Sequence, residues 1–97
     1  MHIVGREKLK DFWQRRPDSE GRLKAWLAEA KHADWSTPAD IKARCGSASI
    51  LKNNRVVFNI GGNKYRLVVQ IDYQRRIILI LFVGTHKEYD RIDAETI

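Results

Sequence analysis

The spacing of apolar residues divides the chain into a helical first third and an extended remainder. Between residues 6 and 16, Leu9, Phe12 and Trp13 follow the i, i+3, i+4 spacing of an amphipathic helix, and the same spacing returns in residues 23–30. Two short amphipathic helices in succession predict a helical hairpin that lies on an apolar surface.

Turn and capping residues set the boundaries of these helices. Pro17 is expected to end the first helix, and Asp18 or Ser19 to cap the second. Thr37, followed by Pro38 at a first helical position, predicts a third and shorter helix.

The rest of the chain has the pattern of strands and tight turns. Residues 49–51 and 55–60 are predicted strands, joined by a turn at Asn53 and Asn54. The sequence Gly61-Gly62-Asn63 predicts the next hairpin, because glycine and asparagine tolerate the positive φ that a short connection requires.

The two strands that follow differ in pattern. The first alternates, with one face made of Tyr65, Leu67, Val69 and Ile71 and the other of Lys64, Arg66, Val68 and Gln70. After a turn at residues 73–76, residues 77–83 are apolar without alternation, which predicts a central strand buried on both faces. Thr85 and Glu88 have capping-box spacing and predict a last helical turn.

These elements predict an α+β fold in one domain, residues 1–97. Two N-terminal helices pack on one face of a mainly antiparallel four-stranded sheet. The other face is expected to stay partly open, with basic side chains around it, and a substrate could lie there.

The charge of the chain points to an anionic partner. The net charge is +6 and the pI is about 9.8, so the domain attracts polyanions without any motif, and an acidic protein would be served equally well. A membrane partner is not expected, because no long lysine-rich amphipathic helix occurs and the longest apolar run has seven residues, 77–83. The N-terminus becomes charged at once, which predicts a soluble, cytoplasmic protein.

Metal and cofactor chemistry has little support in the sequence. Cys45 is the single cysteine, and the histidines at positions 2, 32 and 86 show no ligand spacing. No phosphate-binding glycine loop of the P-loop type occurs. We therefore expect no metal and no cofactor.

The segment from Thr85 to Asp90 holds the groups that metal-free RNA cleavage requires. In that reaction the adjacent 2′-hydroxyl attacks the phosphate, a base and an acid move protons, and cations stabilise the phosphoryl oxygens. His86 can exchange a proton near neutral pH, Tyr89 can do so beside cations or stack on a base, and Lys87 can neutralise phosphate. A plainer alternative is that Thr85 only caps a helix, His86 is a surface residue and Tyr89 covers the core edge.

Further cations and amides extend this hypothesis. Arg66 lies on the strand face away from the helices, where it could clamp a phosphate or be an ordinary solvated arginine. Asn63 and its neighbours are explained by hairpin geometry, yet an asparagine amide can also bind phosphate or a base edge. A non-specific electrostatic footprint for RNA is expected from Lys52, Lys64, Arg75 and Arg76, with Arg6, Lys8 and Lys10.

Two blocks of the sequence resemble the paired signature of HigB-type toxins, which belong to the RelE-like group of toxin–antitoxin proteins. The blocks are Phe58-Asn59-Ile60-Gly61-Gly62-Asn63-Lys64-Tyr65-Arg66-Leu67 and Gly84-Thr85-His86-Lys87-Glu88-Tyr89-Asp90. Both match the pattern in full, and the region from residue 55 to residue 90 is about half of the chain.

The resemblance implies a RelE-like fold and an mRNA endonuclease, or mRNA interferase, that acts on translating ribosomes. It implies a HigA-type helix-turn-helix antitoxin as partner, in a toxin–antitoxin hetero-oligomer. Carried over by position, His86 and Tyr89 become the acid–base pair, Arg66 and Lys87 the phosphate stabilisers, and Asp90 orients a neighbour. Two other functions stay open from the residues themselves: a non-catalytic RNA- or ribosome-binding module, and a domain that binds an acidic protein.

Overall fold

The computed structural model describes all 97 residues, and its elements largely follow the predicted boundaries. They are β1 (His2–Val4), α1 (Arg6–Arg15), a 3₁₀ turn (Pro17–Ser19), α2 (Glu20–His32), α3 (Pro38–Arg44), β2 (Ser49–Ile50), β3 (Arg55–Ile60), β4 (Tyr65–Asp72), β5 (Ile77–Thr85) and α4 (His86–Tyr89). The predicted α+β class is confirmed, and none of the helices has the length and apolar character that a membrane crossing requires.

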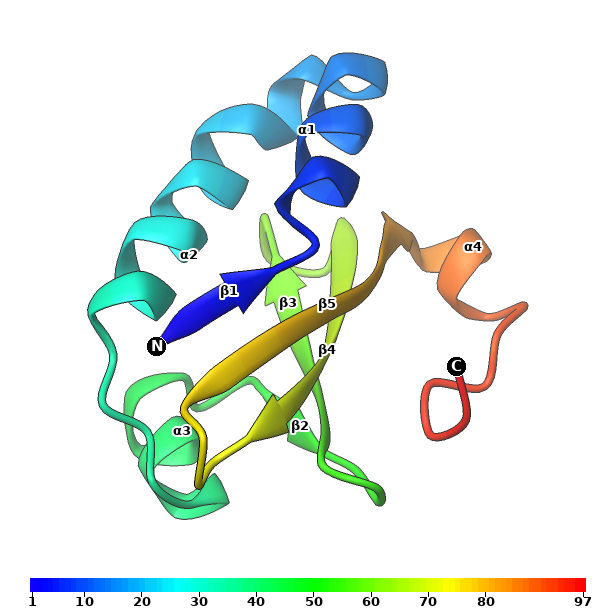
Figure 1. Ribbon diagram of the computed structural model, residues 1–97. Coiled ribbons are helices and arrows are strands. Elements are labelled where there is room, and N and C mark those ends of the chain that lie inside the picture. Colours follow the sequence, from blue (N-terminus) through cyan, green and yellow to red (C-terminus); the bar gives the residue numbers. More distant parts are fainter.

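The sheet has five strands where the sequence predicted four. Its order is β1-β5-β4-β3-β2, with β1 parallel to β5 and every other pair antiparallel. The additional strand is β1, whose residues His2–Val4 pair with Ile77–Leu79. It places the start of the chain beside β5 and beneath the helices (Figure 1).

Local capping differs between the helices. At α3, Thr37 Oγ1 accepts from the Asp40 N–H at 3.4 Å and the Asp40 carboxylate accepts from the Thr37 N–H at 3.1 Å, which confirms the predicted cap. At α2, Ser19 occupies the predicted N-cap position, but its side chain makes no capping hydrogen bond. Buried Ser19 donates its hydroxyl to the Arg16 carbonyl at 2.7 Å, and the Asp18 carboxylate turns towards Tyr65 instead.

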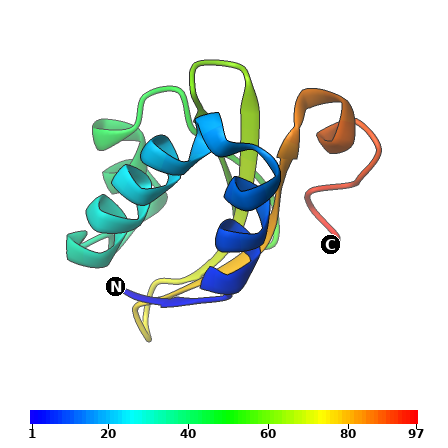
Figure 2. The same cartoon turned by 90° about the horizontal axis from the view of Figure 1, so that it is seen from above.

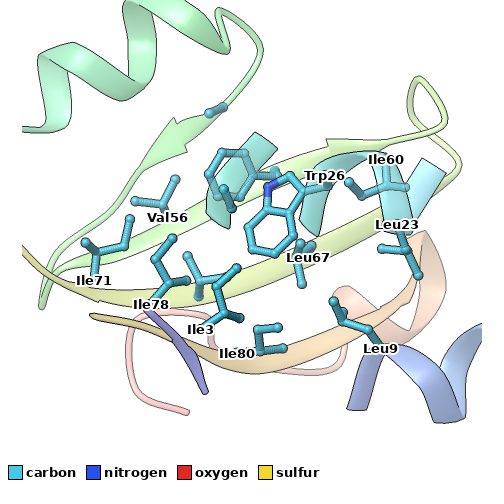
Figure 3. Packing of buried hydrophobic residues seen from close by; sticks show 14 of the residues in the cluster. Ile3, Leu9, Leu23, Trp26, Val56, Ile60, Leu67, Ile71, Ile78 and Ile80 are labelled. Carbon is cyan, nitrogen blue, oxygen red and sulfur yellow. The ribbon is translucent and has the colours of Figure 1, made fainter. Parts of the chain in front are cut away.

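The main core lies between the sheet and the two N-terminal helices (Figure 3). The β4 face predicted to meet the helices does so: Tyr65, Leu67, Val69 and Ile71 all belong to this core and are fully buried or nearly so. Each large apolar side chain buried in this way stabilises the fold by roughly 1.5–3 kcal/mol. The core therefore fixes the orientation of the opposite β4 face, which carries Arg66.

The second face of the sheet is more covered than the sequence predicted. Figure 2 shows α1 and α2 on one side of the sheet and α4 with the C-terminal segment on the other. A small cluster of Val57, Val68 and Ala94 is buried there, and Ile92 packs against it. Glu95 also accepts hydrogen bonds from the Lys52 N–H at 3.3 Å and, through its carbonyl, from Asn53 at 3.0 Å. The C-terminal segment therefore covers part of the face that the sequence predicted to be open, while Leu79 near one end of β5 and His86 and Lys87 beyond the other stay exposed.

Residues 77–83 lie in β5, which runs between β1 and β4, so the predicted central strand is confirmed, but the burial predicted for both of its faces is wrong. Ile78 and Ile80 are fully buried, whereas Leu79 is 36% exposed and forms an exposed apolar pair with its β1 neighbour Val4. A bulge leaves Leu81 without a partner on β4, because Val69 pairs with Ile80 and Val68 with Phe82.

Candidate active site

The candidate site is built where β5 runs directly into α4. Thr85 Oγ1 accepts from the Glu88 N–H at 3.2 Å, and the Glu88 carboxylate accepts from the Thr85 N–H at 2.9 Å, so the predicted capping box is confirmed. The backbone N–H of Thr85, together with the Arg15 guanidinium 3.6 Å away, holds the pKa of Glu88 below its usual value. Glu88 is thus an ionised structural carboxylate that fixes this turn.

The turn presents His86, Lys87 and Tyr89 at the end of the sheet. His86 and Tyr89 are three residues apart in α4, so their side chains are neighbours on one side of the turn. The side chains of His86 and Lys87 are exposed and make no hydrogen bond or ion pair within the chain, which leaves them accessible to a ligand. Tyr89 is half-buried against the Val57–Val68–Ala94 cluster, so its ring is fixed by packing.

Arg66 joins this group from the neighbouring strand. It lies opposite Gly84 in the β4–β5 register, and its guanidinium carbon is 5.8 Å from the centre of the Tyr89 ring. At this distance the cation and the ring attract each other. The structure thus brings together the guanidinium and the phenol that the sequence assigned to one site, and it places the imidazole on the same turn.

Two asparagines of the β3–β4 hairpin surround Arg66. Its Nη1 donates to Asn59 Oδ1, and Asn63 Oδ1 is 3.5 Å from the same nitrogen. Arg66 takes part in no ion pair, so its charge is not cancelled by any carboxylate of the chain. A half-exposed cation held by neutral acceptors is suited to binding a phosphate.

The remaining predicted residues do not all join the site. The Asp90 carboxylate makes no hydrogen bond or ion pair, so the neighbour that the resemblance implied it would orient is not seen. Lys64 was predicted on the open face but forms an ion pair with Asp18 on the helical side, where Tyr65 donates its hydroxyl to the same carboxylate at 2.7 Å. Lys52 lies in the turn before β3, away from the hairpin end where Asn59 is found.

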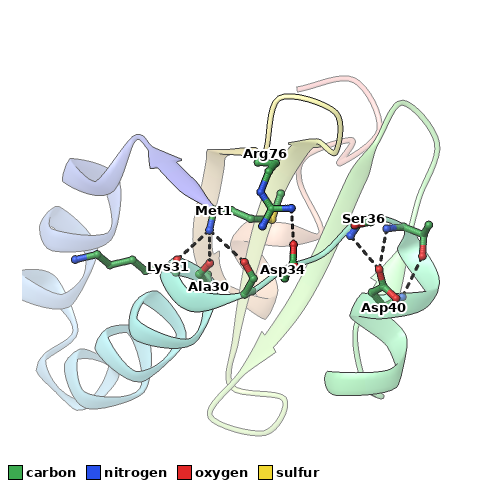
Figure 4. A network of polar contacts seen from close by, with 9 residues as sticks. Met1, Ala30, Lys31, Asp34, Ser36, Asp40 and Arg76 are labelled. Atoms are coloured by element: carbon green, nitrogen blue, oxygen red, sulfur yellow. Dashed lines mark hydrogen bonds and ion pairs between the residues drawn. The ribbon is translucent and has the colours of Figure 1, made fainter.

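Arg75 and Arg76 lie at the opposite end of β5 from His86. β5 has nine residues, so its two ends are about 25 Å apart. Arg76 pairs with Asp34 at 2.5 Å beside the Met1 amino group, which donates to the carbonyls of Ala30, Lys31 and Ala33 (Figure 4). These two arginines can therefore contribute only at a distance from the α4 turn.

Two residues near the site were not among those assigned to it from the sequence. Arg15 reaches from α1 to Glu88, and no sequence signal linked these distant segments. Asn59 was explained mainly by hairpin geometry, with an amide contact to phosphate or a base edge as the alternative, and its contact with Arg66 was not predicted. Counting outward from the predicted three-residue turn at 61–63 would have paired position 59 with position 65; the turn has four residues, 61–64, and pairs position 59 with position 66.

The chemistry available at the α4 turn is proton transfer and phosphate binding. An imidazole, a phenol, a guanidinium and an ammonium are gathered at one edge of the sheet. No three histidine, cysteine, aspartate or glutamate side chains are grouped in a way that could hold a metal ion.

Comparison with known proteins gives a consistent result. A model of the HigB toxin family, described as the RelE-like toxic component of a toxin–antitoxin system, matches residues 19–92. The chain is 32% identical over 96 residues to the mRNA interferase toxin HigB of Escherichia coli strain K12, covering 97% of this chain and 92% of that protein. It has the same identity and coverage with mRNA interferase HigB of Shigella flexneri, and is 23% identical over 94 residues to that of Escherichia coli O6:H1, covering 95% and 91%. Because the family model covers most of the chain and the likeness extends over nearly its full length, the protein belongs to the HigB family of RelE-like toxins.

Proposed function

We propose that this protein is an mRNA interferase, an endoribonuclease that cuts mRNA on the translating ribosome and so stops translation in the cytoplasm. The observation that supports this most is the placement of Arg66 over Tyr89, on the turn that also carries His86. Family membership and the mRNA interferase names of the relatives point to the same activity.

The proposed reaction needs no metal. The 2′-hydroxyl of the nucleotide before the cut loses its proton to a base and attacks phosphorus, a 2′,3′-cyclic phosphate forms, and the 5′-oxygen leaves with a proton from an acid. His86 and Tyr89 supply the base and the acid between them. Arg66 and Lys87 stabilise the negative charge that builds up on the phosphoryl oxygens.

Other residues support binding of the RNA. Asn63 is exposed beside Arg66 and can contact the phosphate or the edge of a base. Thr85 holds the α4 turn. Lys52, Lys64, Arg75 and Arg76 contribute to a wider positive field, in which Lys64 is weakened by its pairing with Asp18.

A translation assay with mapping of mRNA ends by primer extension tests the activity. Wild-type protein should cut mRNA only when ribosomes translate it. We expect His86→Ala and Tyr89→Phe to lower the cleavage rate by about 10²- to 10⁴-fold, as loss of a general acid or base does. The matched control is His32→Ala, because His32 is an exposed histidine on α2. If mRNA stays intact while wild-type protein is bound to ribosomes, the alternative of a non-catalytic RNA- or ribosome-binding module is correct.

The family makes this protein the toxic component of a toxin–antitoxin system, so its partner is an antitoxin. The finer proposal is that this antitoxin is a HigA-type helix-turn-helix protein that forms a hetero-oligomer with the toxin. Co-expression of the adjacent reading frame should restore growth and co-purify with the toxin. Absence of a helix-turn-helix protein from the purified complex would contradict the proposal.

A further inference from the structure

Asn59 faces Arg66 across the β3–β4 hairpin and is hydrogen-bonded on both sides. Its Oδ1 accepts from Arg66 Nη1, and its Nδ2 donates to the carbonyl of Ser47 at 3.2 Å. The guanidinium can only donate and the carbonyl can only accept, so the two partners fix which way the amide points. The Asn59 side chain is therefore committed within the protein and is not free to read a base.

Asn63 differs from Asn59 in this respect. It is exposed in the hairpin turn, and its Oδ1 is 3.5 Å from the same Arg66 nitrogen, at the limit of a hydrogen bond. Asn63 can leave this contact for RNA at little cost. Asn59 would have to give up a close bond to a cation and a second bond to the backbone.

The type of acceptor has a consequence for the charge of Arg66. An aspartate at position 59 would hold the guanidinium firmly but would cancel its charge next to the phosphate. The neutral amide holds it and leaves the full positive charge available. With Gly84 opposite on β5 and the Tyr89 ring 5.8 Å from the guanidinium carbon, the amide of Asn59 is the closest polar contact that sets where this charge lies.

We propose that Asn59 is a positioning residue, which aims the Arg66 guanidinium at the scissile phosphate without neutralising it. This inference rests on the proposed function, because the phosphate enters only through RNA cleavage. It assigns no contact between Asn59 and RNA. Ser47, in the loop before β2, anchors the other side of the amide and so ties that loop to the site.

The test compares single-turnover cleavage of ribosome-bound mRNA by wild-type protein, Asn59→Ala, Arg66→Ala and the double variant, with the toxin in excess so that slow cleavage stays measurable. We expect Asn59→Ala to lower the rate at saturation about 10- to 100-fold, since loss of alignment is costly in catalysis, with a smaller change in the concentration for half-saturation. In the Arg66→Ala background the same change should cost less than about twofold, because the residue that Asn59 aims is absent. Equal losses in both backgrounds would overturn the proposal.

Two more variants separate positioning from other roles. Asn59→Asp keeps an acceptor for Arg66 but, like Asn59→Ala, loses the donor to the Ser47 carbonyl, so its melting temperature is compared with that of Asn59→Ala. Cleavage should still fall below the wild-type rate because the carboxylate cancels the charge of Arg66. Wild-type activity in this variant would overturn the requirement for a neutral acceptor. Gln14→Ala removes an exposed amide on α1 and is the control for truncation, with cleavage expected at the wild-type rate.

The pattern of cut sites gives an independent readout. A positioning role predicts that Asn59→Ala lowers cleavage at all sites alike, whereas a change in sequence preference would show that Asn59 reads a base and would overturn the proposal. If wild-type protein cuts no mRNA, the proposed function fails. If wild-type protein cuts mRNA and Asn59→Ala cuts it equally fast, only the positioning role fails.

Discussion

Gly84 lies where an added methyl group has no room, and Gly84→Ala tests how the end of β5 is packed. A Cβ atom built on Gly84 would be 2.5 Å from Phe82 Cζ and 3.1 Å from both Cβ and Oε1 of Glu88. Ordinary contacts between carbon atoms are about 3.5–4.0 Å, so the ring of Phe82 overlaps the new methyl group by about 1 Å. Either the ring or the Glu88 side chain must move.

Both movements weaken the fold. A displaced Phe82 ring loses contact with the Val57–Val68–Ala94 cluster, and a displaced Glu88 loses its bond to the Thr85 N–H. Overpacking of this kind costs about 1–3 kcal/mol, which corresponds to a lower melting temperature by about 4–8 °C for each kcal/mol in a domain of this size.

Thermal and urea unfolding followed by circular dichroism measure this loss. The variants are made in a His86→Ala background, which the host tolerates if the proposed function is correct. Gly46→Ala is the matched control, because a Cβ atom there meets no atom within 4 Å, and it should change stability by less than about 0.5 kcal/mol. The reasoning is refuted if Gly84→Ala is as stable as this control. Adding Phe82→Leu should recover part of the loss, and purely additive effects would show that the ring is not the obstacle.

Three other outcomes are expected. The hydrogen bond from Lys64 holds the pKa of Asp18 below its usual value, so this carboxylate stabilises the fold above about pH 4 and the contribution is lost as the pH falls further. In Asp18→Asn the melting temperature should therefore change less with pH in that acid range than in the wild type, and an equal pH dependence of the two proteins would contradict this. Phe12 is 2% exposed, and Phe12→Ala should cost about 3–5 kcal/mol in urea unfolding; a loss below 1 kcal/mol would show that the core refills the space. Arg75→Ala should reduce the slope of log RNA affinity against log salt concentration by about the value of one phosphate contact and leave the cleavage rate at saturation unchanged. Arg66→Ala should lower that cleavage rate, and equal effects of the two variants on it would contradict the distances in the structure.

Local patterns predicted most of the fold because the elements concerned are specified locally. The alternation in β4, the caps at Thr37 and Thr85 and the glycine turn at residues 61–63 each depend on neighbouring residues. The missed strand, β1, has three residues and a single buried side chain, Ile3, which is too short to show a period. Only its pairing with β5 makes it a strand.

The errors share a cause, which is packing between segments distant in sequence. A run of seven apolar residues predicted burial on both faces, but the second face at Leu79 has no layer above it. The C-terminal segment covers another part of that face, although its polar sequence has no strand or helix period. The Lys64 side chain lies on the helical side of the sheet and not on the predicted face, because Asp18 supplies a carboxylate on the helical side.

Two parts of the candidate site were predictable from the sequence: the position of the α4 turn, from the motif at residues 84–90, and the face of Arg66, from the strand that follows the turn at residues 61–63. The motif located the α4 turn, and the strand alternation placed Arg66 on the face away from the helices. The contacts of Arg66 with Tyr89 and Asn59 require the register of three strands, which no single segment specifies.

The parallel pairing of β1 with β5 affects how the protein is made. His2 pairs with Ile77, so β1, the first strand to leave the ribosome, stays unpaired until its partner strand has been translated 75 residues later (77 minus 2). Contacts over so long a stretch of chain form late, after local structure. Because α4 follows β5 without a linker, the α4 turn reaches its place beside Arg66 only when β5 has paired with β4. A nascent chain with the proposed activity would thus be harmless to the ribosome that makes it until its last strand has been synthesised.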